Sequence, residues 1–371
     1  MKTCLGVFFG GRSPEADVSV LTAMQVFSAI DFSKYDVVPV YMDGKWWSGD
    51  ELMDVAAFRP FAPEGHVEVA LVGNRLMKIK GKRLKEYKVL DCALICCHGG
   101  EGEGGSLQGA LDLADVPYTS CGVVGSAICM DKILFKQVIS ALKIKAERGV
   151  AVSREEFAAD RVAVLSKIVK RQGFPAIVKP SSLGSSIGVV RAKNREELCD
   201  ALALCFALDE RAVVEREIVR KCELNCAAVR YDGDIFVSAV EKPKQVDGVL
   251  TFEDKYVDGA KGSQQRELPA NIPAELSEKV RATTLKLYSA LNLSGVVRVD
   301  YLFDLDKSEL YVNEINTVPG SMAFYMFKPC GIEFSTLIDM MVEEARVKHG
   351  RERRDFSEFR RGNILSANII K

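Results

Sequence analysis

The stretch Leu310–Met326, LYVNEINTVPGSMAFYM, decides how the rest of the chain is interpreted. If its first half is a strand, the alternating side chains of Leu310 and Val312 share one face with the residues two and four positions further on. Those two residues are Glu314 and Asn316. A carboxylate and an amide are costly to remove from water unless a partner group binds them. The stretch therefore predicts a strand with a polar site on one face.

The residues just before this stretch supply candidate partners. They alternate in the same way, and a turn centred near Lys307 would join the two strands into a hairpin. In that register Asp300 lies opposite Glu314. The next pair on the same face is Arg298 opposite Asn316. The hairpin therefore gathers two acids, an amide and a guanidinium on one surface.

Two facing carboxylates repel each other unless a cation lies between them. With the amide oxygen of Asn316 beside them, Asp300 and Glu314 form a hard, all-oxygen set that suits Mg²⁺ (or Mn²⁺) bound together with phosphates. A structural alternative stays open, in which Arg298 simply neutralises the two acids.

Composition describes an ordinary globular protein of two or three domains. The chain has 371 residues, of which 48% are hydrophobic and 27% charged, and its net charge is −1. We expect no nucleic-acid partner, because the basic runs at 351–354 and 360–361 are typical of solvated surface. We expect no membrane segment, because no apolar run reaches 18 residues.

The eleven cysteines indicate a reducing compartment. Their number is odd, no pair has CxxC spacing, and many lie within apolar runs. Buried reduced thiols in a cytoplasmic protein explain this pattern best. A metal site built on Cys222 and Cys226 is an alternative for which the sequence offers no further ligands.

The N-terminal segment has the order of a βαβ unit. An apolar run at 3–9 ends at two glycines, and a helix that covers 18–30 is followed by a strand at 37–41. Ser13 should cap that helix, with Glu15 at its positive end. The fingerprint GxGxxG is absent, which disfavours a nicotinamide-dependent oxidoreductase.

A central strand at 89–97 leads into a glycine-rich run that begins at His98. Ligands of open α/β sheets bind at this edge, so His98 is a candidate substrate residue. A structural histidine with both ring nitrogens satisfied is the alternative. The helix expected next to this region covers 123–142 without a break.

A second candidate site surrounds the Gly/Ser run 181–188. The buried strand 174–180 before it carries Lys179, and a strand rather than a helix follows it, so this is no Walker A motif. A Gly/Ser hairpin beside a buried lysine can fold over phosphates and donate backbone N–H groups to them. A plain polar turn is the alternative. The long segment 243–273 has the composition of a lid.

Seven segments, taken in order, resemble those of the ATP-grasp ligases, and closely those of the D-alanine:D-alanine ligase family. They are GGRSPEADVS at 10–19, HGGEGEGGSLQG at 98–109, MDK at 130–132, IVKPSSLGSSIGV at 177–189, KY at 255–256, RVD at 298–300 and NEINTVPGS at 313–321. The resemblance extends over nearly the whole chain.

The resemblance implies α/β and α+β structure in a three-domain ATP-grasp architecture with an N-terminal doubly wound parallel sheet. It implies an N-terminal substrate domain at 1–130, a central ATP-grasp subdomain at 131–214 and a C-terminal catalytic domain at 215–350. The tail at 351–371 has no assigned role. Small molecules are the implied partners, and relatives of this kind are commonly homodimers.

The resemblance also implies a role for individual residues. ATP binding would involve Lys132, Lys179, Ser186, Glu215, Ile218, Glu223 and Lys255. Magnesium would be held by Asp300, Glu314 and Asn316. The implied catalytic group is Glu15, Ser185, Tyr256, Arg298 and the backbone of Gly320, and the amino acids would contact His98, Ser321 and Tyr325.

The implied reaction makes D-alanyl-D-alanine for peptidoglycan. ATP phosphorylates the carboxylate of the first D-alanine, and the amine of the second attacks the acyl phosphate. Two departures from the family pattern concern the substrates: Gly104 replaces an acid, and Tyr325 replaces a serine that binds the acceptor. A sister ligase that uses D-serine or D-lactate, and a non-catalytic nucleotide sensor, are the alternatives.

Overall fold

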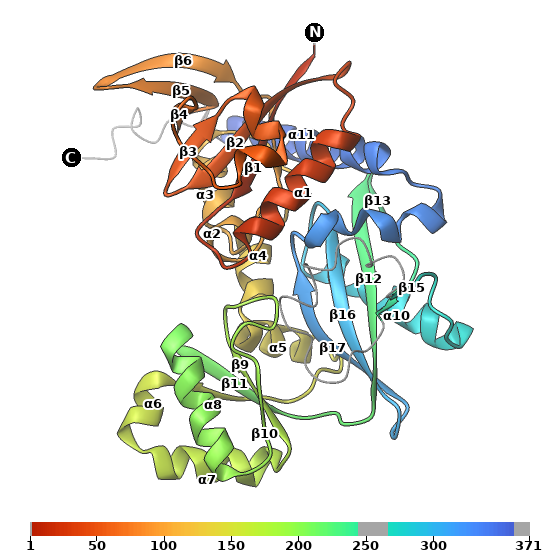
Figure 1. Ribbon diagram of the computed structural model, residues 1–371. Coiled ribbons are helices and arrows are strands. Elements are labelled where there is room, and N and C mark those ends of the chain that lie inside the picture. The colour runs from red at the N-terminus through yellow and green to blue at the C-terminus, as the bar shows by residue number, and fades with distance from the viewer. Residues whose placement is uncertain (1, 244–265, 360–371) are drawn as a thin grey trace, which may run out of the picture.

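The computed structural model describes residues 2–243 and 266–359, and the side chains up to residue 352. Figure 1 shows three bodies: an N-terminal sheet with its helices, a smaller body at the lower left, and a second sheet with α10 at the right. Among the helices that are described, none has both the length and the apolar character to cross a membrane.

The N-terminal body is a seven-stranded sheet in the order β6-β5-β4-β3-β2-β1-β7. Only β2, β1 and β7 are parallel, and β3 to β6 extend the sheet as antiparallel hairpins. The predicted parallel sheet is therefore limited to one end of this sheet, the strands β2, β1 and β7. The elements are β1 (Thr3–Gly10), α1 (Ala16–Ala29), β2 (Tyr35–Asp43), β3 (Lys45–Ser48), β4 (Val67–Val72), β5 (Arg75–Lys80), β6 (Arg83–Val89), β7 (Cys92–Ile95), α2 (Gly100–Glu103), α3 (Ser106–Ala114) and α4 (Val123–Met130).

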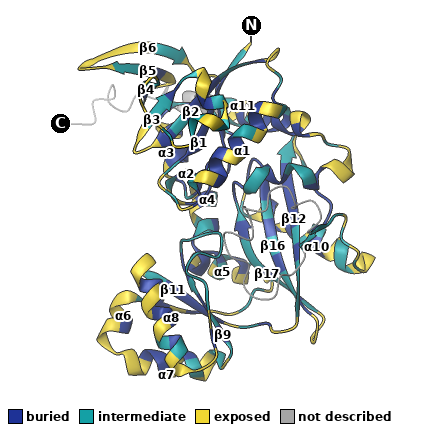
Figure 2. Cartoon of the chain, viewed as in Figure 1, coloured by how far each residue is buried: buried dark blue, intermediate teal, exposed yellow. Residues whose placement is uncertain are grey.

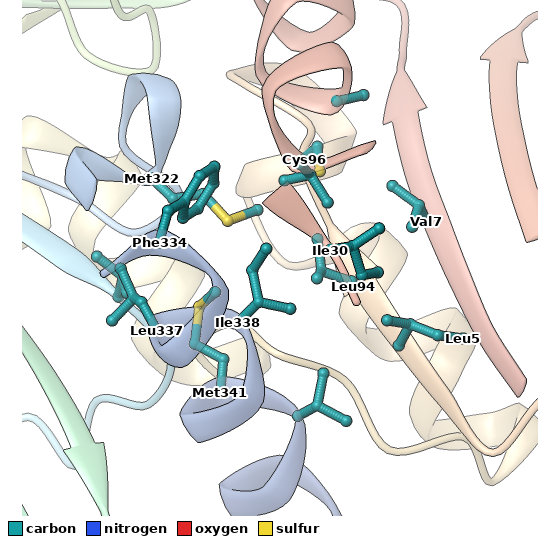
Figure 3. Close-up of a cluster of buried hydrophobic side chains, with 14 of the residues drawn as sticks. Leu5, Val7, Ile30, Leu94, Cys96, Met322, Phe334, Leu337, Ile338 and Met341 are labelled. Atoms are coloured by element: carbon teal, nitrogen blue, oxygen red, sulfur yellow. The ribbon is translucent and has the colours of Figure 1, made fainter. Parts of the chain in front are cut away.

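Helices cover both faces of this sheet. α1 and the last helix, α11 (Phe334–Phe359), pack on one face, and α3 packs on the other. Leu337, Ile338 and Met341 of α11 lie against Leu5 and Leu94 of the sheet (Figure 3). The C-terminal helix thus ties the end of the chain to the N-terminal body. Figure 2 shows the central strands as the most buried part of the molecule.

The central body is a four-stranded sheet in the order β10-β9-β11-β8, covered by helices. Its strands are antiparallel, and the Gly/Ser run joins β9 to β10 as a hairpin. The elements are α5 (Lys132–Ala141), β8 (Val150–Ser153), α6 (Arg154–Ala159), α7 (Arg161–Gln172), β9 (Ala176–Pro180), β10 (Val190–Ala192), α8 (Arg195–Leu208) and β11 (Arg211–Arg216).

The C-terminal body is an antiparallel sheet in the order β13-β12-β16-β17, with a small sheet β14-β15 beside it. Its core side packs on α10, with Tyr288 and Leu287 buried. The elements are β12 (Lys221–Tyr231), β13 (Asp234–Val237), β14 (Lys242–Pro243), β15 (Arg266–Glu267), α10 (Ala274–Ala290), β16 (Val297–Asp304), β17 (Glu309–Asn316) and the 3₁₀ turn η4 (Gly320–Met326).

Three sequence predictions about the helices are wrong. The helix expected over 123–142 is two helices, because Asp131 leaves the helical conformation and caps α5 through the N–H groups of Ile133 and Leu134. Helix α1 begins one residue after Glu15, while Ser13 Oγ accepts only the N–H of Glu15 itself. The tail assigned to 351–371 is shorter, since α11 continues to residue 359.

Candidate active site

The β16–β17 hairpin has the register that the sequence predicts at its open end. Asp300 pairs with Glu314, and Arg298 pairs with Asn316. Between Asp300 and Tyr301 the register shifts by one residue, because β17 has a bulge at Asn313.

The bulge overturns one prediction about the faces of β17. Leu310 and Val312 lie in the hydrophobic core together with Ile315, so they are on the opposite face from Glu314. A bulge inserts one residue and thereby reverses the alternation. The polar face is consequently free of the two apolar side chains that the sequence placed there.

Arg298 neutralises Asp300, one of the two facing acids. Its guanidinium forms a bidentate pair with Asp300, with Nε–Oδ1 2.6 Å and Nη2–Oδ2 2.8 Å. Burial opposes the charge of Arg298, but Asp300 outweighs burial and raises the pKa of the guanidinium. Glu314 instead faces Lys132, whose Nζ lies 3.5 Å from its Oε2. The alternative in which Arg298 neutralises both acids thus holds for Asp300 and not for Glu314.

The donor set fits a metal that shares its ligands with a substrate. Asp300, Glu314 and Asn316 supply oxygen atoms from two neighbouring strands, with the Asn316 amide nitrogen 3.1 Å from Asp300 Oδ2. Among the described residues, no three His, Cys, Asp or Glu side chains converge on one point, and this also removes support for Cys222 and Cys226. Mg²⁺ is typically bound by one or two carboxylates, with phosphates and water completing the shell.

Two lysines from different elements face this hairpin. Lys132 is the first residue of α5, and its Nζ donates to the carbonyl of Leu183 at 2.6 Å. Lys179 lies on β9, and its Nζ donates to Asn313 Oδ1 at 2.9 Å. The β17 bulge is what turns Asn313 toward Lys179. The central body and the C-terminal body therefore meet at a pair of buried ammonium groups.

Glu215, at the end of β11, lies between Lys179 and a third lysine, Lys136. The ion-pair distances are 2.7 Å to Lys179 and 2.5 Å to Lys136, and the glutamate is almost fully buried. Burial alone would raise the pKa of Glu215, but the two lysines lower it to about 2. Our sequence reasoning missed Lys136. Its position four residues after Lys132 in one helix was the available signal.

The Gly/Ser loop 181–188 reaches from the central body to the N-terminal body (Figure 1). Ser185 Oγ donates a hydrogen bond to Glu15 Oε1. Ser185 and Ser186 both have positive φ, a conformation that costs free energy in non-glycine residues. A Cβ on Gly184 would lie 2.8 Å from Glu15 Oε2, so a larger residue there would displace the Glu15 carboxylate. Burial raises the pKa of Glu15, and this effect outweighs the hydrogen bond from Ser185, which lowers it.

His98 is buried, and both of its ring nitrogens have partners. Nε2 lies 2.7 Å from Thr22 Oγ1, and Nδ1 lies 2.7 Å from the carbonyl oxygen of Val318. Burial lowers the pKa of His98. In the neutral ring Nδ1 donates to Val318 and Nε2 accepts from Thr22, whose oxygen in turn accepts the N–H of Ser321. His98 therefore holds the segment that follows Asn316 at the end of β17.

Glu103 binds the same segment, at Thr317 and Val318. No role for it was predicted from the sequence. One carboxylate oxygen accepts the N–H groups of Thr317 at 2.8 Å and Val318 at 3.0 Å, and the other accepts the N–H of Gly99 at 2.9 Å. Burial raises the pKa of Glu103 in spite of these bonds. An acid inside the glycine-rich run 99–105, which has five glycines, was the available signal.

The turn that follows β17, η4, has an unusual backbone. Ser321, Met322 and Ala323 all have positive φ, between 46° and 53°. Three such residues in a row are strained, and strain of this kind concentrates at functional sites. The turn begins at Gly320 and presents Tyr325, whose hydroxyl lies 3.2 Å from Glu241 Oε2.

The remaining predicted residues are placed as follows. Ile218 is buried, and Glu223 on β12 is half-buried with Lys221 Nζ 3.7 Å from its carboxylate. Lys255 and Tyr256 lie outside the described residues, as does most of the segment 243–273.

Two antiparallel sheets therefore face one cluster of lysines and carboxylates, and the loop 181–188 reaches across to the N-terminal sheet. Together the fold and the cluster define an ATP-grasp enzyme. Solved structures of similar shape are the D-alanine-D-alanine ligase of Coxiella burnetii, with a TM-score of 0.81 at 25% identity, and a D-Ala:D-Ser ligase of Enterococcus faecalis, with a TM-score of 0.78 at 26% identity. They cover 97% and 93% of this chain, which covers 99% and 100% of theirs.

Sequence comparison identifies the family within that class. The models for the D-ala D-ala ligase N-terminus and C-terminus match residues 4–121 and 138–343. The D-alanine--D-alanine ligase of Chlorobaculum parvum is 35% identical over 92% of this chain and 96% of its own, and that of Thermosipho africanus is 32% identical over 92% of each. The chain belongs to the D-alanine–D-alanine ligase family.

Proposed function

We propose that this protein is an ADP-forming ligase that joins two D-alanines for peptidoglycan synthesis. The observation that carries the proposal is the pairing of Asp300 with Glu314 directly opposite the buried Lys132 and Lys179. ATP supplies the γ-phosphoryl group, and Mg²⁺ held by Asp300, Glu314 and Asn316 would supply positive charge against the phosphates. No side chain needs to act as a nucleophile in such a transfer, so positioning and charge neutralisation provide most of the acceleration.

Lys132 and Lys179 bind the phosphates. In the structure both make contacts with groups that the phosphates would replace, the carbonyl of Leu183 and the amide of Asn313. Ser186 and the N–H groups of its loop cover the phosphates, with Lys255 as a further cation. The adenosine lies against Glu215, Ile218 and Glu223, as the family resemblance implies.

The metal ligands are Asp300, Glu314 and Asn316. Arg298 shares Asp300 with the metal site, so its guanidinium lies where negative charge develops on the carbonyl oxygen of the first D-alanine. The N–H of Gly320 assists it. Glu103 and His98 keep this N–H in position, because both bind Val318, and Thr22, the other partner of His98, accepts the N–H of Ser321.

The first D-alanine occupies the space beside Glu15, His98 and Ser321. The bond between Glu15 and Ser185 positions the substrate, and Tyr256 completes the group. The carboxylate of the first D-alanine accepts the γ-phosphoryl group of ATP, and ADP leaves. The amine of the second D-alanine then attacks the carbonyl carbon, the C–N bond forms, and the bond to phosphate breaks.

The wider organisation is part of the same proposal. Residues 1–130, 131–214 and 215–350 act as the substrate domain, the central ATP-grasp subdomain and the catalytic domain. The protein works in the cytoplasm, where ATP is available, and forms a homodimer. Light scattering of the purified chain at micromolar concentration tests the dimer, and a monomeric mass would contradict it.

Phosphate release from ATP and Mg²⁺ tests the function. The assay compares D-alanine alone with D-alanine plus D-serine, and with D-alanine plus D-lactate. We expect release with D-alanine alone and a product with the mass of D-alanyl-D-alanine. Release that requires D-serine would support a D-Ala:D-Ser ligase, the activity named for one structure of similar shape. No release with any acceptor would favour the nucleotide sensor.

A further inference from the structure

Glu241 is a buried carboxylate on the same face of the C-terminal sheet as the metal ligands. Asn225 pairs with Asp300 across β12 and β16, and on its other side it forms a β-bridge with Glu241. Residues that pair across strands point to the same face. Glu241, Asn225, Asp300 and Glu314 therefore form one row across the sheet. The proposed reaction does not yet use Glu241.

Two neutral groups fix the carboxylate of Glu241. Asn225 Nδ2 donates to its Oε2 at 3.0 Å, and the hydroxyl of Tyr325 donates to the same oxygen at 3.2 Å. Burial raises the pKa of Tyr325, so this hydroxyl keeps its proton and remains a donor. Only about 5% of the Glu241 side chain is exposed. A carboxylate held this firmly has a defined direction.

Arg266 supplies the opposite charge next to it. The Arg266 guanidinium lies over the Tyr325 ring, 4.2 Å from its centroid, and Nη1 is 3.6 Å from Glu241 Oε1. About a third of the Arg266 side chain is exposed, so this end of the cluster is reached from solvent. The ring of Tyr325 thus carries a cation on its face and binds an anion through its hydroxyl.

We propose that Glu241, Arg266 and Tyr325 form the subsite for the second amino acid, with its ammonium on Glu241 and its carboxylate on Arg266. An α-amino acid has opposite charges on adjacent groups, and it matches a carboxylate and a guanidinium that lie side by side. A hydroxy acid such as D-lactate lacks the ammonium and would gain no charge-assisted contact with Glu241. This inference rests on the proposed function and assigns the acceptor subsite within it.

The location of the cluster suits an acceptor. Asn225, which holds Glu241, pairs with Asp300 across β12 and β16, and Asp300 binds Arg298. An ammonium on Glu241 would therefore lie near the guanidinium that the proposed reaction places beside the reacting carbonyl.

Steady-state kinetics with the full-length enzyme tests the subsite. Because the two D-alanines bind separately, their KM values are resolved from the dependence of rate on D-alanine concentration. We expect Glu241→Gln and Arg266→Met each to raise the KM of the second D-alanine about 10-fold to 100-fold, the cost of one charge-assisted contact. Glu241→Asp and Arg266→Lys should recover part of this loss.

Isotope exchange separates the subsite from the first half-reaction. Scrambling of ¹⁸O in ATP that depends on D-alanine reports transfer to the first substrate alone. It should stay within about twofold of wild type in all four variants. The matched control is Glu343→Gln, which removes a bond between Tyr231 and a carboxylate, 3.0 Å long and at the surface. This variant should behave as wild type in both assays.

The outcomes are distinct. An unchanged KM for the second D-alanine in Glu241→Gln or Arg266→Met would overturn the proposal, as would equal losses in exchange and ligation. A wild-type enzyme that shows no D-alanine-dependent exchange at all would refute the proposed function instead. Circular dichroism and thermal unfolding verify that each variant is folded before its kinetics are interpreted.

Discussion

Two buried glutamates of this molecule are compensated in different ways. Glu215 in the central body lies between Lys136 and Lys179, and its pKa falls to about 2. Glu103 in the N-terminal body receives backbone N–H groups and the hydroxyl of Thr317, with no cation in contact among the described residues, and burial raises its pKa. Both carboxylates are buried and hydrogen-bonded or ion-paired, yet their pKa values move in opposite directions.

The two forms of compensation suit different functions of a buried carboxylate. Full charges from flexible lysines can be redistributed, so Lys179 can leave Glu215 for a phosphate while Lys136 keeps the glutamate ionised. Backbone dipoles cannot be redistributed without moving the chain, so Glu103 fixes the geometry of the segment 317–318. The first arrangement suits a site that must exchange partners. The second suits a group that fixes the backbone just before η4.

Loss of Lys179 should have the largest effect on activity. Lys179→Ala removes a cation from the phosphates, and we expect phosphate release to fall about a thousandfold or more. Because Lys136 still neutralises Glu215, the variant should remain folded. The control is Lys145→Ala, at an exposed lysine that pairs with Glu309 on the surface. Wild-type turnover in Lys179→Ala would remove its assigned role.

Loss of Glu215 should have the largest effect on stability. Glu215→Ala leaves two buried ammonium groups to repel each other, and breaking a buried pair from one side costs roughly 3–5 kcal/mol. Urea unfolding followed by circular dichroism measures this cost. The matched variant Glu309→Ala breaks an exposed pair and should lose about 1 kcal/mol or less. Equal losses in the two variants would contradict the central role given to the lysines.

Loss of Glu103 should lower activity less than loss of Lys179 does, and stability less than loss of Glu215 does. Glu103→Ala leaves the N–H groups of Gly99, Thr317 and Val318 without their acceptor, and with water able to enter the space left by the side chain we expect a total loss of roughly 1–3 kcal/mol. The kcat should fall about tenfold or more, because the oxyanion donor at Gly320 moves, while the KM for ATP changes little. A selective rise in that KM would show that Glu103 serves the nucleotide instead.

The pH dependence of stability should show the smallest and most specific difference. The pKa of Glu215 is about 2 in the folded protein against 4.5 ordinarily, so its stabilisation is complete above about pH 4.5 and is lost as the pH falls toward 2. Glu103, with a raised pKa, gives the opposite sign, because the folded state takes up its proton first.

Thermal unfolding between pH 6 and pH 3 measures this contrast. Relative to wild type, Glu215→Gln should lose less stability as the pH falls, and Glu103→Gln should lose more. Parallel curves for all three proteins would show that neither carboxylate titrates as its surroundings indicate. Salt is held constant in these measurements, since it screens exposed charges and leaves buried pairs nearly unaffected.

Much of the candidate site could be predicted from local pattern. Alternation in two neighbouring segments and a short turn between them were enough to pair Asp300 with Glu314. Lys179 was visible as a cation at the end of an apolar strand. Glu103 and Lys136 were not predicted, because their partners are 214 and 79 residues away in the sequence, at Thr317 and Glu215. Pairings over such separations leave no periodic signal.

By itself, the sequence determined the N-terminal βαβ order, the hairpin register that pairs Asp300 with Glu314 and the family. Those features follow from local sterics and from the burial of apolar side chains, which act over a few residues. Only the tertiary structure decided that a bulge at Asn313 turns Val312 into the core and Asn313 toward Lys179. A bulge depends on what packs against both faces of a strand, and here the two faces meet different bodies of the molecule.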